Sequence, residues 1–252
     1  MSAPRRGLMV PILIVALGLM VLIGLGTWQI ERKAWKEALI ATLTQRLDAE
    51  PQPLPPAARW AALERSAYEF ARVKFRAEFL LGADPRKREA RLYTGGSALR
   101  DDIKVPGYFV FASARLADGS VVVVNRGYVA SVHPTSATPP AALPPAPVDV
   151  IGVIRFAERP GWFDQTYNAV DDLWFVRDHA AMAARNGWGA VAPFYVDMEA
   201  SAPPGGIPRA GRITVKLRND HLQYALTWYG LAAVLLIVFT VWVRGRRSPA
   251  KP

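Results

Sequence analysis

The stretch "LQYALTWYGLAAVLLIVFTVWV", residues 222–243, contains no charged side chain and decides the fold of this chain. A helix rises 1.5 Å per residue, so about 20 apolar residues cross the ~30 Å hydrocarbon core of a bilayer. A second charge-free stretch, "LMVPILIVALGLMVLIGLGTWQI", covers residues 8–30. Tryptophan and tyrosine at one end of each stretch are typical of the membrane interface. The sequence therefore predicts two transmembrane helices, at residues 8–30 and 222–243.

The first stretch has an alternative interpretation as a cleaved signal peptide, because two arginines precede it. Its apolar run is longer than the usual core of roughly 7–15 residues, however, and no A-x-A cleavage site follows it. We interpret it as an uncleaved anchor that forms a helical hairpin with the second stretch.

Charge predicts the direction of insertion. The tails, residues 1–7 and 244–252, hold six basic residues and no acidic one. The chain has 31 Lys and Arg against 21 Asp and Glu, so 25 basic and 21 acidic residues remain between the stretches. Short basic segments stay in the cytoplasm, whereas long loops are translocated. We expect cytoplasmic tails and an extracytoplasmic domain at residues 31–221. The net charge of +10 then mainly reflects the orientation of the chain in the membrane, so it does not indicate a nucleic-acid partner, and none is expected.

Composition excludes several functions. The chain has no cysteine, which rules out disulfides and thiolate sites for copper, zinc or redox exchange. Its five methionines are scattered, which disfavours copper delivery through soft ligands. The sequence contains no G-x-S-x-G, H-E-x-x-H or Walker motif, and its three histidines are widely separated. We therefore expect a protein that is not an enzyme.

The region between the two stretches should start as a helix and continue as strands. A helical pattern persists to about residue 50, where the prolines of "EPQPLPP" end it, and a short helix can follow near residues 57–68. From about residue 71 apolar and charged residues alternate with the period of a strand, and Asp118-Gly119 separates two β-rich runs as a hairpin turn would. Further strands are expected within residues 148–157 and 193–198, with a helix at 178–187. The predicted fold is a membrane α-helical hairpin carrying an α+β, mainly antiparallel β, domain that is open or barrel-like.

Four segments resemble marker segments of the Surfeit-locus family. They are "GTWQIERKAWKEALI" (residues 26–40), "VNRGYV" (124–129), "FVRDHAAMAA" (175–184) and "LRNDHLQYALTWYG" (217–230), and they follow in order along nearly the whole chain. The resemblance implies an assembly factor for haem-copper cytochrome c oxidase that binds or presents haem a for insertion into the catalytic subunit. It implies that subunit as a partner, with haem a synthase as a second candidate, beside membrane lipid. The alternative is a structural chaperone that holds an oxidase subunit without touching haem.

The two helix ends offer residues suited to haem a. In an antiparallel hairpin, the residues that begin the second span lie at the same outer depth as those that end the first. Haem iron accepts imidazole, haem carboxylates favour Arg or Lys at the interface, and the farnesyl tail prefers lipid. The candidate cofactor-binding residues are His221, as the haem-iron ligand, with Arg32, Gln29, Trp28, Tyr224 and Trp228. At helical spacing His221, Tyr224 and Trp228 share a face.

The same residues have simpler interpretations, which stay open. The aromatic side chains can serve as interface anchors, Arg32 can extend towards phospholipid headgroups, and His221 can bond to Asp220 or to a lipid. Elsewhere, Arg126 is expected to be a charge at a strand end, with a contact to a partner as the alternative. His133 and His179 are expected to be exposed or bonded to backbone. An Ala-, Arg- and Pro-rich chain without a transit peptide before residue 8 favours a bacterial inner membrane.

Overall fold

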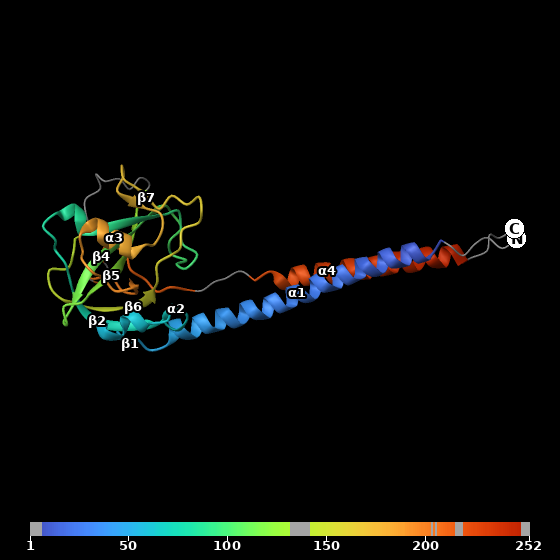
Figure 1. The fold of residues 1–252 in the computed structure, drawn as a ribbon, viewed down its shortest axis with the longest axis horizontal. Coiled ribbons are helices and arrows are strands. Elements are labelled where there is room, and N and C mark those ends of the chain that lie inside the picture. Colours follow the sequence, from blue (N-terminus) through green and yellow to red (C-terminus); the bar gives the residue numbers. More distant parts are fainter. Residues whose placement is uncertain (1–6, 132–141, 203, 205, 215–218, 248–252) are drawn as a thin grey trace. The chain divides into compact units, whose positions relative to one another are not determined.

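The computed structural model describes residues 7–131, 142–202, 204, 206–214 and 219–247. The chain forms two compact units, one of Met1–Thr42 with Leu217–Pro252 and the other of Leu43–Lys216 (Figure 1). His133, for which an exposed or backbone-bonded position was predicted, lies outside the described residues.

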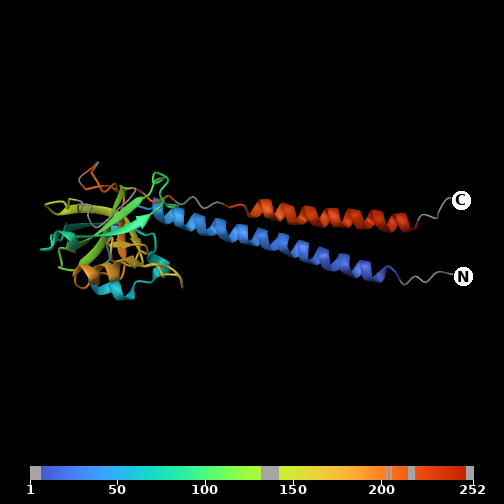
Figure 2. The same cartoon turned by 90° about the horizontal axis from the view of Figure 1, so that it is seen from above.

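The first unit is an antiparallel pair of helices (Figure 2). These are α1 (Met9–Asp48), whose residues up to Thr42 belong to this unit, and α4 (His221–Arg247). Both helices are long and apolar enough to cross a membrane, and only 6% of the most apolar segment of each helix is buried within the protein. Side chains such as Leu13 and Ile237 remain exposed, at 65% and 62%, as lipid-facing residues would. The predicted pair of membrane helices on either side of a β-rich domain is confirmed.

The second unit is built around a closed sheet. Its strands are β2 (Arg72–Phe79), β6 (Val148–Arg155), β9 (Tyr195–Met198), β5 (Val121–Ala130) and β4 (Gly107–Leu116), paired in that order. Strand β4 also pairs with β2, through Ala77 with Leu116 and Phe79 with Ala114, so the sheet closes into a barrel. Within this ring only the β5–β9 pairing is parallel.

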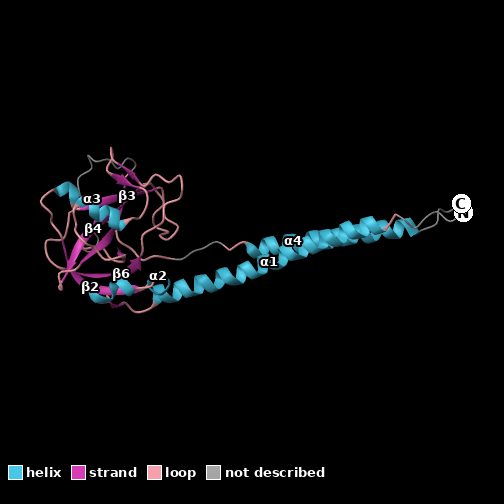
Figure 3. Cartoon of the chain, in the orientation of Figure 1, coloured by secondary structure: helices cyan, strands magenta, loops and turns pink. Residues whose placement is uncertain are grey.

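The remaining elements extend and cover this barrel. Strand β3 (Glu89–Thr94) pairs with β4, followed by β8 (Leu173–Trp174) and β7 (Tyr167–Asn168), while β1 (Gln52–Pro53) pairs with β2. Helix α3 (His179–Asn186) lies against the strands, as Figure 3 shows. Short helices η1 (Ala57–Ala62), α2 (Arg65–Tyr68) and η2 (Pro85–Lys87) complete the unit. The single helix predicted near residues 57–68 is divided because the backbone is extended at Leu63 and Glu64.

Alternation of apolar side chains places two cores on opposite faces of β4 and β5. One core contains Ala112, Ala114, Val122 and Val124 with Phe194. The other contains Phe109, Phe111 and Val123, and Met182 and Ala183 of α3 cover it. Both faces of these strands are therefore buried, which explains their nearly continuous apolar sequence.

The end of α1 is part of the second unit. Leu47 is buried against Val153 and Ile213. Arg46 donates hydrogen bonds to the carbonyl oxygens of Glu69 and Ser66, at 3.0 and 2.9 Å. These contacts attach the last turns of α1 to α2 and to the barrel.

His179 is buried at the start of α3, 2% exposed. Its Nε2 lies 3.1 Å from the Ala192 carbonyl oxygen, so Nε2 donates a proton there, while Nδ1 has no partner among the described residues. Burial lowers the pKa of His179, because the charged ring would lose its water.

We predict a pH dependence from this histidine. Its folded pKa lies below the unfolded value of about 6.5, so protonation favours the unfolded chain and stability falls as the pH drops below that value. The slope contributed is at most about 1.4 kcal/mol per pH unit. His179→Gln keeps an amide donor for Ala192 and cannot titrate, so its unfolding free energy should change less between about pH 7 and 5. Denaturant unfolding of both proteins measures this, and identical slopes would contradict it.

Candidate functional site

The two helices of the first unit contact each other along a seven-residue repeat. Up to residue 239, the partly or fully buried positions on α4 are His221, Ala225, Trp228, Ala232, Leu235 and Phe239; Thr240 and Val243 are also partly buried, in the last turns of the helix. This alternating four- and three-residue spacing is the seam of a coiled-coil-like packing. On α1, Cβ atoms built at Gly18 and Gly26 would lie 3.1 Å from Leu235 and 2.7 Å from Tyr229. The two glycines thus leave room for side chains of α4 to pack directly on the α1 backbone.

The seam ends in polar contacts. His221 Nδ1 lies 2.7 Å from Gln29 Oε1. Next to it, Thr27 Oγ1 and the Tyr229 hydroxyl are 3.1 Å apart, where the absence of a side chain at Gly26 makes room for the Tyr229 ring. Sequence reasoning predicted the shared depth of His221 and Gln29, but it missed Gly26, Thr27 and Tyr229. The repeated glycines of "LGLMVLIGLG", residues 17–26, were the available signal.

The contact with Gln29 decides the tautomer of His221. An amide oxygen only accepts hydrogen bonds, so Nδ1 carries the proton and donates it. The lone pair then lies on Nε2, and no described residue bonds that atom. A metal-binding histidine has this arrangement, with one ring nitrogen oriented by an oxygen acceptor and the other available as a ligand.

The other candidate residues divide into two groups. Trp228 is half-buried on the seam, two helical turns beyond His221. Trp28 and Tyr224 point away from the seam and are 53% and 56% exposed. Arg32 is also exposed, and its guanidinium carbon lies 3.9 Å from the centre of the Trp35 ring. The predicted shared face therefore holds for His221 and Trp228, whereas Tyr224 lies at its outer edge.

We expect Gly26→Val to separate the helices, because its Cβ would overlap the Tyr229 ring and overpacking costs about 1–3 kcal/mol. Gly24→Val is the matched control, since nothing lies within 4 Å of a Cβ built there. The readout is oxidative cross-linking between cysteines introduced at Gly18 and Leu235, in a chain that has no native cysteine. The yield should fall for Gly26→Val only; an equal yield in both variants would contradict the packing.

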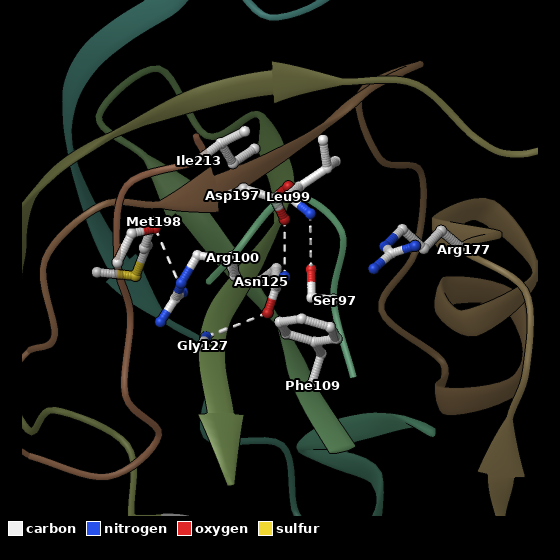
Figure 4. A pocket seen from close by; sticks show the side chains of 11 residues that line it. Ser97, Leu99, Arg100, Phe109, Asn125, Gly127, Arg177, Asp197, Met198 and Ile213 are labelled. Carbon is white, nitrogen blue, oxygen red and sulfur yellow. Dashed lines mark hydrogen bonds between the residues drawn. The ribbon is translucent and has the colours of Figure 1, made fainter. Parts of the chain in front are cut away.

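The barrel holds a second polar cluster, which sequence reasoning did not find (Figure 4). Asp197 accepts hydrogen bonds from Asn125 Nδ2 at 2.7 Å and from Arg155 at 3.3 Å. Arg155 also donates to Glu69, at 2.8 Å. The adjacent cavity, lined by Phe109, Arg177 and Ile213 among others, measures about 20 Å³. That volume suits one water molecule rather than a cofactor, so the cluster is a structural network.

The prediction for Arg126 needs correction. Arg126 is not a charge at a strand end: it is 3% exposed in the middle of β5, at a β-bulge between the residue pairs Val110–Gly127 and Phe111–Asn125. Its side chain donates to the Ala142 carbonyl, and burial lowers its pKa. The prediction for His179 is confirmed in one of its two alternatives, because the buried ring bonds to the backbone carbonyl of Ala192. Within the described ranges, no group of three His, Cys, Asp or Glu residues is placed to hold a metal ion.

These features define a class: a membrane protein with a closed β domain between two apolar helices and a polar, histidine-containing end to the helix pair. The SURF1 family model matches residues 16–233. The chain is 35% identical to Surfeit locus protein 1 of Rattus norvegicus, over 90% of this chain and 73% of the rat protein. It is 37% identical to the Homo sapiens protein of that name, over 88% and 74% of the two chains. It is 34% identical to a SURF1-like protein of Monosiga brevicollis, over 89% and 83%. The chain belongs to the SURF1 family.

Proposed function

We propose that this chain is an assembly factor for a haem-copper cytochrome c oxidase. In this proposal, it holds haem a at the polar end of its helix pair and presents it to the oxidase catalytic subunit. Membership in the SURF1 family supports the assembly role. The geometry of His221 supports the cofactor role.

The proposed binding of haem a rests on the orientation of His221. Gln29 fixes the proton on Nδ1, at 2.7 Å, and leaves Nε2 able to bind iron. The ring is half-buried at the start of α4, so it is shielded on one side by the neighbouring helix. The same contact also links the two helices, as hydrogen bonds between polar side chains do in pairs of membrane helices.

The surrounding residues fit the other parts of haem a. Arg32, Lys33 and Lys36 follow Gln29 on α1, and each can bind a haem carboxylate at the interface. Lys33 and Lys36 are partly buried on the same face as Gln29, four and seven residues further on, and Lys33 pairs with Glu37 at 2.7 Å. Trp28, Tyr224 and Trp228 offer aromatic surface to a porphyrin ring or to lipid. Haem a brings redox chemistry that operates only in the completed oxidase.

A structural chaperone without haem is the second candidate function. Exposed aromatic and basic residues on α1, such as Trp35 at 53%, would serve equally to hold an oxidase subunit. The proposed partners are the catalytic subunit and haem a synthase in either case.

Complementation tests the assembly role. In cells that lack this protein, we expect a loss of assembled oxidase and of membrane haem a bound to its catalytic subunit, both restored by the full chain. The catalytic subunit should also co-purify with the protein during assembly. Normal oxidase levels in the deletion strain would contradict an assembly role of either kind.

We further propose that both termini are cytoplasmic and that the barrel is extracytoplasmic, because the two tails carry only basic charge. The Ala-, Arg- and Pro-rich composition supports the plasma membrane of a bacterium as the location. Ser120, in the turn between β4 and β5, is exposed and suits a reporter cysteine. Ser120→Cys should react with a membrane-impermeant maleimide in intact spheroplasts. A cysteine placed after Arg246 should react only after lysis, and the reverse pattern would contradict the orientation.

A further inference from the structure

A loop of the barrel unit exposes two adjacent aromatic side chains. Trp162 and Phe163 are each 100% exposed. The turn that presents them is held by Asp164, whose carboxylate accepts from the Gly161 amide at 2.8 Å and whose amide donates to the Gly161 carbonyl at 3.2 Å. Leaving two large aromatic side chains in water is unfavourable, because burial of their apolar surface would be favourable.

The base of this loop lies at the end of the barrel from which both connections to the helices leave. Arg65 of α2 donates to the Ala157 carbonyl at 3.1 Å, and α2 in turn accepts a hydrogen bond from Arg46 of α1. On the other side, Glu158 pairs with Arg177 at 2.8 Å. Arg177 and Ile213 line the same small cavity, and Ile213 packs on Leu47.

Chain length keeps this end of the barrel near the bilayer. From Thr214 to His221 there are seven Cα steps, which span at most about 25 Å. From Ile30 to Leu43 the helix rises about 20 Å along its axis, and the height above the bilayer is less if the helix is tilted. The headgroup layer extends roughly 5–7 Å beyond the hydrocarbon core. The loop that carries Trp162 and Phe163 extends a few residues beyond Glu158. These residues can cover the distance that remains between the barrel and the headgroup layer.

The neighbouring charges favour a lipid surface over a protein as the occupant. Arg159 is exposed just before the aromatic pair. Lys104 and Val105 are exposed in the loop whose Leu99 accepts a hydrogen bond from Thr214, at the same end of the barrel. Asp164 follows the aromatic pair directly, but its carboxylate accepts the hydrogen bond of the Gly161 amide. The exposed basic residues near the two rings suit the headgroup region of a membrane that contains anionic lipid.

We propose that the loop carrying Trp162 and Phe163 is a second membrane contact, which inserts these side chains into the interface of the bilayer that α1 and α4 span. This role is independent of haem binding, and its failure would leave the proposed function untouched.

The test uses the full chain in lipid nanodiscs of phosphatidylcholine with phosphatidylglycerol. Phe163→Cys is labelled with an environment-sensitive fluorophore; Trp162 stays in place. We expect blue-shifted emission, strong quenching by a nitroxide lipid and little quenching by iodide, because interfacial side chains sit roughly 5–10 Å into the headgroup and acyl boundary. The same label at Ser120→Cys, in the β4–β5 turn, is the control and should respond to iodide only.

A further substitution, Trp162→Asp in the labelled protein, should move the fluorophore into water without unfolding the barrel, since neither side chain contributes to its core. The proposal is overturned if the label at 163 responds to iodide as strongly as the label at 120. It is also overturned if the label is shielded from iodide but not quenched by the nitroxide lipid, because a protein surface would then be the occupant.

Discussion

Replacing His221 with alanine should leave the protein in the membrane at its normal level and strongly reduce the assembled oxidase. The apolar run of α4 begins at Leu222, so its length is unaltered, and insertion does not depend on the histidine. The variant lacks the nitrogen that we propose binds haem iron. Immunoblotting of membranes, together with oxidase activity and haem a content, measures both parts of this expectation.

Two further variants make the test specific. Gln29→Leu removes the acceptor that orients His221 but keeps the histidine, and loss of such a partner typically costs about 10–100-fold in metal affinity. Its effect should therefore be smaller than that of His221→Ala. Gln223→Ala, on an exposed position of the same helical turn, should behave as wild type. Equal oxidase levels in the His221 and Gln223 variants would exclude an essential role for the imidazole.

We expect a large loss of stability when Gly127 is replaced, because this position tolerates no side chain. Its φ is +129°, and a Cβ there would lie 2.3 Å from the backbone carbonyl carbon of Arg209. The overlap would break the bridge in which Tyr128 and Arg209 exchange two backbone hydrogen bonds, at 3.0 and 2.8 Å. Gly127→Ala should lose more than about 4 kcal/mol of stability, as the most severe single substitutions do.

Gly119→Ala is the matched control for this effect. Gly119 also has a positive φ, +83°, but nothing lies within 4 Å of a Cβ built there. Its cost should be limited to the conformational strain of about 1–2 kcal/mol. Thermal unfolding followed by circular dichroism compares the two variants, and similar melting temperatures would show that the close approach of residues 127 and 209 is not required.

Local periodicity explains which parts of the fold could be predicted from the sequence. The charge-free runs, the alternation along β2 and the Asp118-Gly119 turn each depend on a few neighbouring residues. In contrast, β7 and β8 have two residues each, which is too short for any periodic signal. The β-bulge at Arg126 depends on how β4 and β5 pair. Because this pairing cannot be read from the local sequence, the buried Arg126 was interpreted as an ordinary charge at a strand end.

In the candidate site, too, some features could be predicted from the local sequence and others could not. The depth of His221 and Gln29 followed from the ends of two apolar runs, and the structure brings the two side chains together. The outward position of Tyr224 could not be predicted, because it depends on the seven-residue seam between the helices rather than on the helix alone. The Asn125–Asp197–Arg155 network joins residues 72 and 42 positions apart, and only the barrel topology brings them together.

The most direct test of the proposed haem site is the absorption spectrum of the full chain, purified from cells that make haem a. We predict a Soret band in stoichiometric amount, with the features of histidine-ligated haem, that is lost or shifted in His221→Ala. An equally abundant protein with no bound haem, or a His221→Ala protein with an unchanged spectrum, would contradict the assignment of His221 as the iron ligand.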